Sequence, residues 1–233
     1  MTAQDKYIMG ILVVGLVLVS IFALIQNPEK EDKIQVSGTG ELSVDPDKAE
    51  VYVQILTLNE SAQTAKDMNS ELTNKVIQAL EGSGISEDNI ETESFNLRQR
   101  EEYNPRTEER EFKGYEATNL IKVTTTPGLA GSVVDTSVNN GANGIQRVSF
   151  DLTQERERQV RDEAMQIASE NAVSKAENLA QSLGVELGKL TSASESGFRY
   201  QPFEYAEDVR AGTTIPSGKV SVSAQVSLSY MIR

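Results

Sequence analysis

Carboxylates and aromatic rings are the side chains of this chain that could do chemistry, because the sequence contains neither cysteine nor histidine. Without those two residue types there is no Ser-His-Asp triad, no thiolate nucleophile and no Cys/His zinc site. Acid–base catalysis by Asp and Glu alone requires two carboxylates held in different environments. The sequence shows no framed pair of that kind, so a glycosidase-like enzyme is the weakest hypothesis. We expect a protein that is not an enzyme and binds no cofactor.

Four glutamates gather in the charged segment REEYNPRTEER at 100–110. Carboxylate oxygens are ligands for hard cations, but the spacing here is not that of a calcium loop. A charged segment with Asn-Pro in its middle is typical of a long hairpin tip, where carboxylates are solvated. We therefore expect no metal at these four positions, which are Glu101, Glu102, Glu108 and Glu109.

A Gly-Thr-Gly segment at 38–40 resembles the opening of a nucleotide-binding loop. Neither the third glycine of a dinucleotide fingerprint nor the lysine of a Walker motif follows at the required spacing. Glycine inside a strand otherwise marks the close approach of another part of the chain. The sequence therefore favours a tight strand segment in the core over a nucleotide site.

The segment 198–215, FRYQPFEYAEDVRAGTTI, alternates aromatic and charged side chains and is predicted to be a long loop. Long loops inside compact domains are often functional, and aromatic residues are enriched in the cores of interfaces. Two interpretations stay open: the rings contact a ligand or a partner, or they cap the nearby sheet edge. The candidate interaction residues are Phe198, Tyr200, Phe203 and Tyr205.

An uncharged apolar run from Tyr7 to Ile25 lies near the start of the chain. At about 1.5 Å per residue, a helix of this length nearly matches the roughly 30 Å hydrocarbon core of a bilayer. We predict a transmembrane anchor at 1–27, a charged linker at 28–33 and one globular domain at 34–233. Secretion after signal cleavage is the alternative, although no A-x-A-like site follows the run.

The charge pattern bears on location and partners. Lysines lie on both sides of the apolar run, so the positive-inside rule gives no orientation. The short N-terminal stub before a long domain is the arrangement of an uncleaved signal anchor, which places the C-terminal domain outside the cytoplasm. The formal charge of −13 argues against nucleic acid as a partner, because phosphate binding needs clustered Lys and Arg.

Apolar periodicity predicts an irregular alternation of strands and helices after the linker. The first two strands, separated by Asp45-Pro46-Asp47, are predicted to form a hairpin. The fold class is therefore α+β, with an antiparallel or mixed sheet and helices packed on one face, preceded by one N-terminal transmembrane helix. The predicted strands cover 34–42, 49–55, 90–99, 115–123, 145–152, 190–198 and 220–232, and the helices 62–79, 128–139 and 155–183.

These segments, in this order and spacing, resemble the SIMPL domain family, which includes bacterial periplasmic and outer-membrane immunogenic proteins and an oxidative-stress defence protein. The resemblance implies an envelope-located α+β domain, a capacity for self-assembly, and a loose association with stress defence, with no catalytic residues to carry over. The resembling stretches are IQVSGTGELSVDPDKAEVYV (34–53), GISEDNIETESFNL (84–97), GYEATNLIKVT (114–124), GANGIQRVSF (141–150), the helix ending LAQSLGVELGKL, and IPSGKVSVSAQVSLSY near the end.

Two functional hypotheses follow. In the first, the chain is a membrane-anchored homo-oligomer whose edge strands and aromatic loop join copies. In the second, it is a monomeric module that binds a ligand or a partner protein through the loop at 198–215. The mass of the chain in solution distinguishes them.

Overall fold

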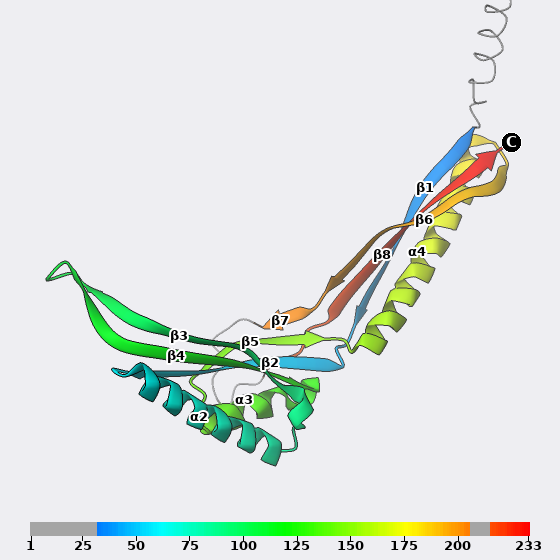
Figure 1. Ribbon diagram of the computed structural model, residues 1–233. Coiled ribbons are helices and arrows are strands. Elements are labelled where there is room, and N and C mark those ends of the chain that lie inside the picture. Colours follow the sequence, from blue (N-terminus) through cyan, green and yellow to red (C-terminus); the bar gives the residue numbers. More distant parts are fainter. Residues whose placement is uncertain (1–31, 206–214) are drawn as a thin grey trace, which may run out of the picture.

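The computed structural model describes residues 32–205 and 215–233, which form an α+β fold with two antiparallel sheets (Figure 1). The predicted anchor at 1–27, with its apolar run at 7–25, lies outside these ranges, as does most of the predicted linker. Within the described ranges, no helix combines the length and the apolar character needed to cross a membrane. The elements are β1 (Lys33–Val44), β2 (Lys48–Asn59), α2 (Ala62–Gly82), β3 (Ile90–Asn104), β4 (Glu109–Thr125), α3 (Ala130–Asn139), β5 (Gly144–Asp151), α4 (Gln154–Leu183), β6 (Leu187–Gln201), β7 (Phe203–Tyr205) and β8 (Val220–Ile232).

The two sheets lie end to end in a bent molecule (Figure 1). One has the order β1-β8-β6 and the other the order β3-β4-β2-β5-β7. Helix α4 packs on one face of the first, while α2 and α3 pack on one face of the second. α2, α3 and α4 lie on the outer side of the bend, so both helix-free faces turn towards its inner side (Figure 1). The α+β class and the one-sided helix packing are thus confirmed, with two antiparallel sheets where one was predicted.

The predicted hairpin of the first two strands is wrong. β1 pairs with β8, from Lys33 opposite Met231 to Val44 opposite Val220, whereas β2 pairs with β4 and β5. The turn between β1 and β2 carries the chain from one sheet to the other. Alternation predicts where a strand lies and which face is buried, but not which strand it pairs with.

The first sheet is held by unusually close packing between β1 and α4. A Cβ atom added at Gly38 or Gly40 would overlap backbone atoms of α4, so only glycine allows this approach. The facing stripe of α4 is made of small, buried residues. The Gly-Thr-Gly segment is therefore a tight strand segment in the core, as predicted, and the stripe is Ala164, Ala168, Ala172 and Ala176.

The core of the second sheet lies between its strands and α2 and α3. The inward side chains of β2 are fully buried, and Val76 and Leu80 of α2 belong to the same core cluster. The buried amide of Asn69 on α2 donates to the carbonyl oxygens of Ile55, at 2.9 Å, and Ala117, at 3.0 Å. This amide links α2 to two neighbouring strands and satisfies backbone groups inside the core.

Candidate functional site

The described part of the predicted aromatic loop, residues 198–205, is largely strand. Phe198 and Tyr200 lie in β6, opposite Ala224 and Val222 of β8. After Gln201 the chain enters β7, which pairs with β5 and belongs to the other sheet. Residues 206–214 lie outside the described ranges. The sequence did not reveal this crossing because β7 spans only three residues, too few for a periodic signal.

Three of the four candidate rings contact the two cores. The Arg161 guanidinium lies 4.4 Å from the ring centre of Phe198, and Phe203 lies 6.2 Å from Phe150, centre to centre. The hydroxyl of Tyr200 contacts the carboxylate of Asp151. These contacts favour the interpretation in which the rings close the sheets.

For Tyr205 the structure describes the backbone alone, opposite Val148 of β5. An interaction role for Phe198, Tyr200, Phe203 and Tyr205 stays a prediction.

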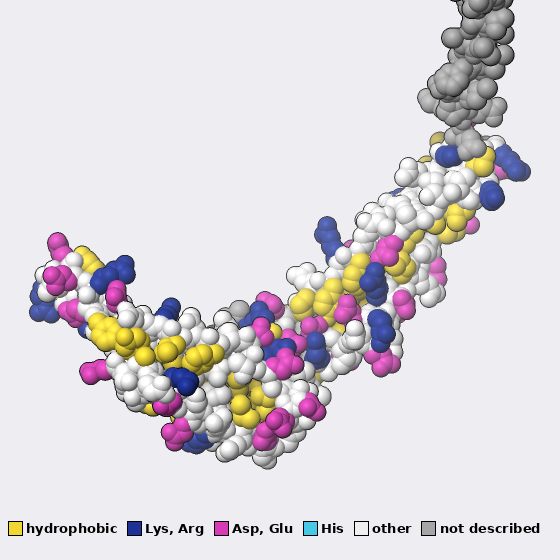
Figure 2. Space-filling view, in the orientation of Figure 1, with side chains coloured by type: hydrophobic (Ala, Val, Ile, Leu, Met, Phe, Trp, Pro, Cys, Tyr) yellow, Lys and Arg dark blue, Asp and Glu magenta, His cyan; other side chains and the backbone are white. Residues whose placement is uncertain are grey.

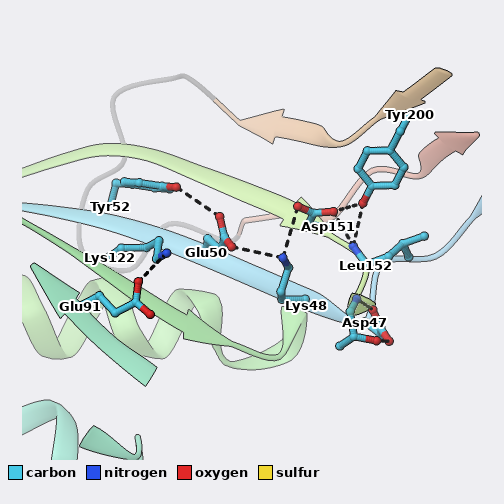
Figure 3. A network of polar contacts seen from close by, with 10 residues as sticks. Asp47, Lys48, Glu50, Tyr52, Glu91, Lys122, Asp151, Leu152 and Tyr200 are labelled. Carbon is cyan, nitrogen blue, oxygen red and sulfur yellow. Dashed lines mark hydrogen bonds and ion pairs between the residues drawn. The ribbon is translucent and has the colours of Figure 1, made fainter. Parts of the chain in front are cut away.

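A polar network, the junction network, joins the two sheets where the chain crosses between them (Figure 3). It consists of Lys48, Glu50, Asp151, Leu152 and Tyr200. Lys48 lies 3.2 Å from Glu50 and 3.4 Å from Asp151. The backbone N–H of Leu152 donates to the Tyr200 hydroxyl at 3.1 Å. Burial disfavours the charged form of Lys48, but the two carboxylates outweigh it and raise the pKa of Lys48 above its ordinary value. The network ties β2, β5 and β6 together.

A second charged cluster lies on the helix-free face of the five-stranded sheet. The carboxylate of Glu116 is 4% exposed and accepts hydrogen bonds from Arg98, at 2.6 and 2.9 Å, and from Arg100, at 3.0 Å. Next to it is a polar hollow of about 260 Å³ whose lining includes Gln54 and Asn96. The two arginines of β3 hold the buried carboxylate of β4, so this cluster has a structural role and fixes β3 on β4.

The glutamates of the predicted hairpin tip do not converge. Glu101 lies 3.8 Å from Arg110, Glu102 is opposite Glu111, and Glu109 is opposite Asn104. Neighbouring positions on a strand point to opposite faces, so the carboxylates are divided between the two faces. In the described ranges no three acidic side chains lie close enough to hold a metal ion.

The outer edges of the two sheets are the most conspicuous surface feature. β1 and β6 border the first sheet, and β3 and the three-residue β7 border the second. Two carbonyl groups of β1 already accept hydrogen bonds from α4: Ser37 from Lys175 at 3.2 Å, and Thr39 from Asn171 at 2.9 Å. β6 and β3 each have 15 mostly exposed residues and one paired neighbour. Such edges are templates for the addition of another strand.

Most of this chain matches the model of one protein family. The model of the SIMPL family, described as "Protein of unknown function (DUF541)", matches residues 34–230. This match covers both sheets and all the described helices. The chain therefore belongs to the SIMPL family, as the sequence motifs predicted.

Curated relatives cover most of the same region. The chain is 29% identical over 167 residues to the "26 kDa periplasmic immunogenic protein" of Brucella melitensis, covering 70% of this chain and 66% of that protein. It is 28% identical over 193 residues to YggE of Edwardsiella ictaluri, covering 82% and 78%. It is 29% identical over 170 residues to YggE of Escherichia coli K12, covering 72% and 68%. The chain thus spans just under two thirds of the length of the Brucella relative.

Proposed function

We propose that this protein is a non-catalytic assembly module of the cell envelope, anchored in the membrane through 7–25, with its two sheets outside the cytoplasm. The name of the Brucella relative, a periplasmic protein, supports this location. The apolar run at the start of the sequence supports the anchor. A link to envelope or oxidative-stress defence rests on the family resemblance alone.

The observation that carries the proposal is the open edge of β6. Its central stretch, Leu190 to Gly197, is exposed and carries one charge, at Glu195. Edge strands that must stay unpaired are blunted by lysine, proline, a β-bulge or a covering element. β6 has register shifts against β8 between Leu187 and Leu190, Leu190 and Ser192, and Glu195 and Gly197, so its regular stretch open to pairing is Ser192 to Glu195. β1 is partly covered by α4, whereas β6 pairs with β8 alone. Strand addition from a second copy would satisfy the backbone groups along this edge.

Lysines placed on this edge test the proposal. The double substitution Ser192→Lys and Ser194→Lys introduces two charges on exposed positions of β6, which should reduce the mass of the assembly in light scattering. The matched control is Ser174→Lys with Ser182→Lys, which adds the same charge on exposed positions of α4. A β6 variant that keeps the wild-type mass would contradict the role of this edge.

The alternative function, a monomeric module that binds a ligand or protein through 198–215, receives less support. Phe198, Tyr200 and Phe203 contact the sheets and the junction network, so they are not free to enclose a ligand. A strictly monomeric mass would favour this alternative, and deletion of 200–214 would then be expected to abolish binding.

A further inference from the structure

The β3–β4 hairpin projects from the five-stranded sheet as an arm (Figure 1). β2 pairs with β4 up to Asn59 opposite Tyr115, whereas β3 and β4 stay paired as far as Asn104 opposite Glu109. From Tyr115 to the hairpin tip the arm is therefore a ribbon of β3 and β4 alone. Isolated two-stranded ribbons are marginally stable in water and gain stability from additional strands.

The arm exposes large apolar side chains. On the two-stranded part Tyr103 is 60% exposed and Phe112 51%, and at the base of the arm Phe95 is 47% exposed and Leu97 38%. Hydrophobic side chains gather over the arm in Figure 2, with charges of both signs between them. Contiguous exposed apolar groups rimmed by polar residues mark surfaces that contact other proteins.

The two edges of the arm differ in regularity. β4 has a register shift at Lys113, next to Gly114, whose φ is +127°. A bulge of this kind twists a strand and disfavours pairing on that edge. β3 pairs with β4 residue by residue from Ser94 to Arg100 and from Glu101 to Asn104, and the extra residue at the shift lies on β4. The regular edge of the arm is therefore β3.

The charge order along β3 is self-complementary in the antiparallel direction. Arg98 and Arg100 precede Glu101 and Glu102, so a second copy running in the opposite direction brings glutamates beside arginines. A two-fold axis at Arg100 places Arg98 opposite Glu102 twice and, on the other face, Leu97 opposite Tyr103 twice. Opposite charges and aromatic–aliphatic pairs at directly opposed positions stabilise a sheet.

This axis also brings the two copies of Arg100 together. Each Arg100 already lies 3.0 Å from the buried carboxylate of Glu116 in its own chain, which offsets the repulsion. We infer that β3 is the contact surface for β3 of a second copy, in an isologous antiparallel pair centred on Arg100. The inference rests on the proposed function and specifies one of its interfaces.

Single cysteines test the pairing, because the full chain contains no cysteine of its own. Disulfides form when Cα atoms lie within about 7 Å, so under mild oxidation R100C should yield at least about fivefold more covalent dimer than R98C or E102C. Those two are matched controls on the same face of β3. An equimolar mixture of R98C and E102C, with different tags, should give the mixed dimer.

The outcomes separate this inference from the proposed function. Dimer formation that peaks at R100C supports the two-fold pairing. Uniform cross-linking along β3, or a peak at E111C on β4, overturns it. No cross-link on β3 in a chain whose mass still exceeds the monomer overturns the arm pairing and leaves the assembly proposal intact. A strictly monomeric mass overturns both.

Discussion

At the scale of single residues, the close contact of β1 with α4 depends on two glycines. Gly38→Ala places a methyl group against the backbone of α4, near Ala168 and Ala172, and neither backbone can move alone. We expect a loss of about 2 kcal/mol or more in the free energy of unfolding, as for overpacked cores. Urea unfolding of the fragment 31–233 measures it.

A glycine on the same sheet supplies the control. No atom lies within 4 Å of a Cβ added at Gly197 of β6, so Gly197→Ala should change the free energy of unfolding by no more than about 0.5 kcal/mol. Equal effects of the two substitutions would show that close packing is not what requires glycine at 38.

Lys48 gives the junction network a pH dependence. Its pKa in the folded protein lies above the ordinary value of 10.5, because of Glu50 and Asp151. The stabilisation is therefore fully present below about pH 10.5 and is lost as the pH rises through the folded pKa. Because the Lys48 side chain is 25% exposed, we expect its ion pairs to contribute about 1 kcal/mol or less to the free energy of unfolding.

The measurement is urea unfolding of wild type and Lys48→Met between about pH 8 and pH 12. The difference in the free energy of unfolding between wild type and Lys48→Met should be largest at about pH 8 and shrink towards about pH 12. Lys66→Met, at an exposed position of α2, is the control for the loss of a lysine. A difference that does not depend on pH would mean that packing, not charge, is what Lys48 contributes.

At the scale of elements, periodicity predicted most strands and helices but not their partners. α4 (Gln154–Leu183) and β8 (Val220–Ile232) lie where the sequence predicted a helix and a strand, at 155–183 and 220–232. β3 has a register shift at Glu93, inside the strand that the sequence predicted at 90–99. The pairing of β1 with β8 was missed because strand pairing is decided by contacts far apart in the sequence.

The candidate site was predicted only in outline. The aromatic composition of 198–215 pointed to that segment, but the role of its rings depends on the crossing into β7, a strand too short to give a periodic signal. The burial of Glu116 could not be predicted from the sequence, because a glutamate within a strand is expected to be exposed. Its burial follows from two arginines of the neighbouring strand, a pairing that periodicity cannot predict.

At the scale of the whole molecule, the bend leaves two helix-free faces and two open edges available at once (Figure 1). The edge of β6 lies on one sheet and the arm edge of β3 on the other. Two different interfaces on one chain allow closed rings or clusters, whereas a single two-fold interface stops at a dimer. The β6 lysine variant should therefore retain a dimer that depends on β3.

We propose that copies of this chain join through open strand edges. The most direct test of this proposal is the mass of the fragment 31–233, measured by light scattering coupled to size exclusion. This fragment retains every described residue of both hydrophobic cores. We predict a discrete multiple of the monomer mass, reduced by Ser192→Lys with Ser194→Lys. A monomer mass at every concentration would contradict assembly through these edges.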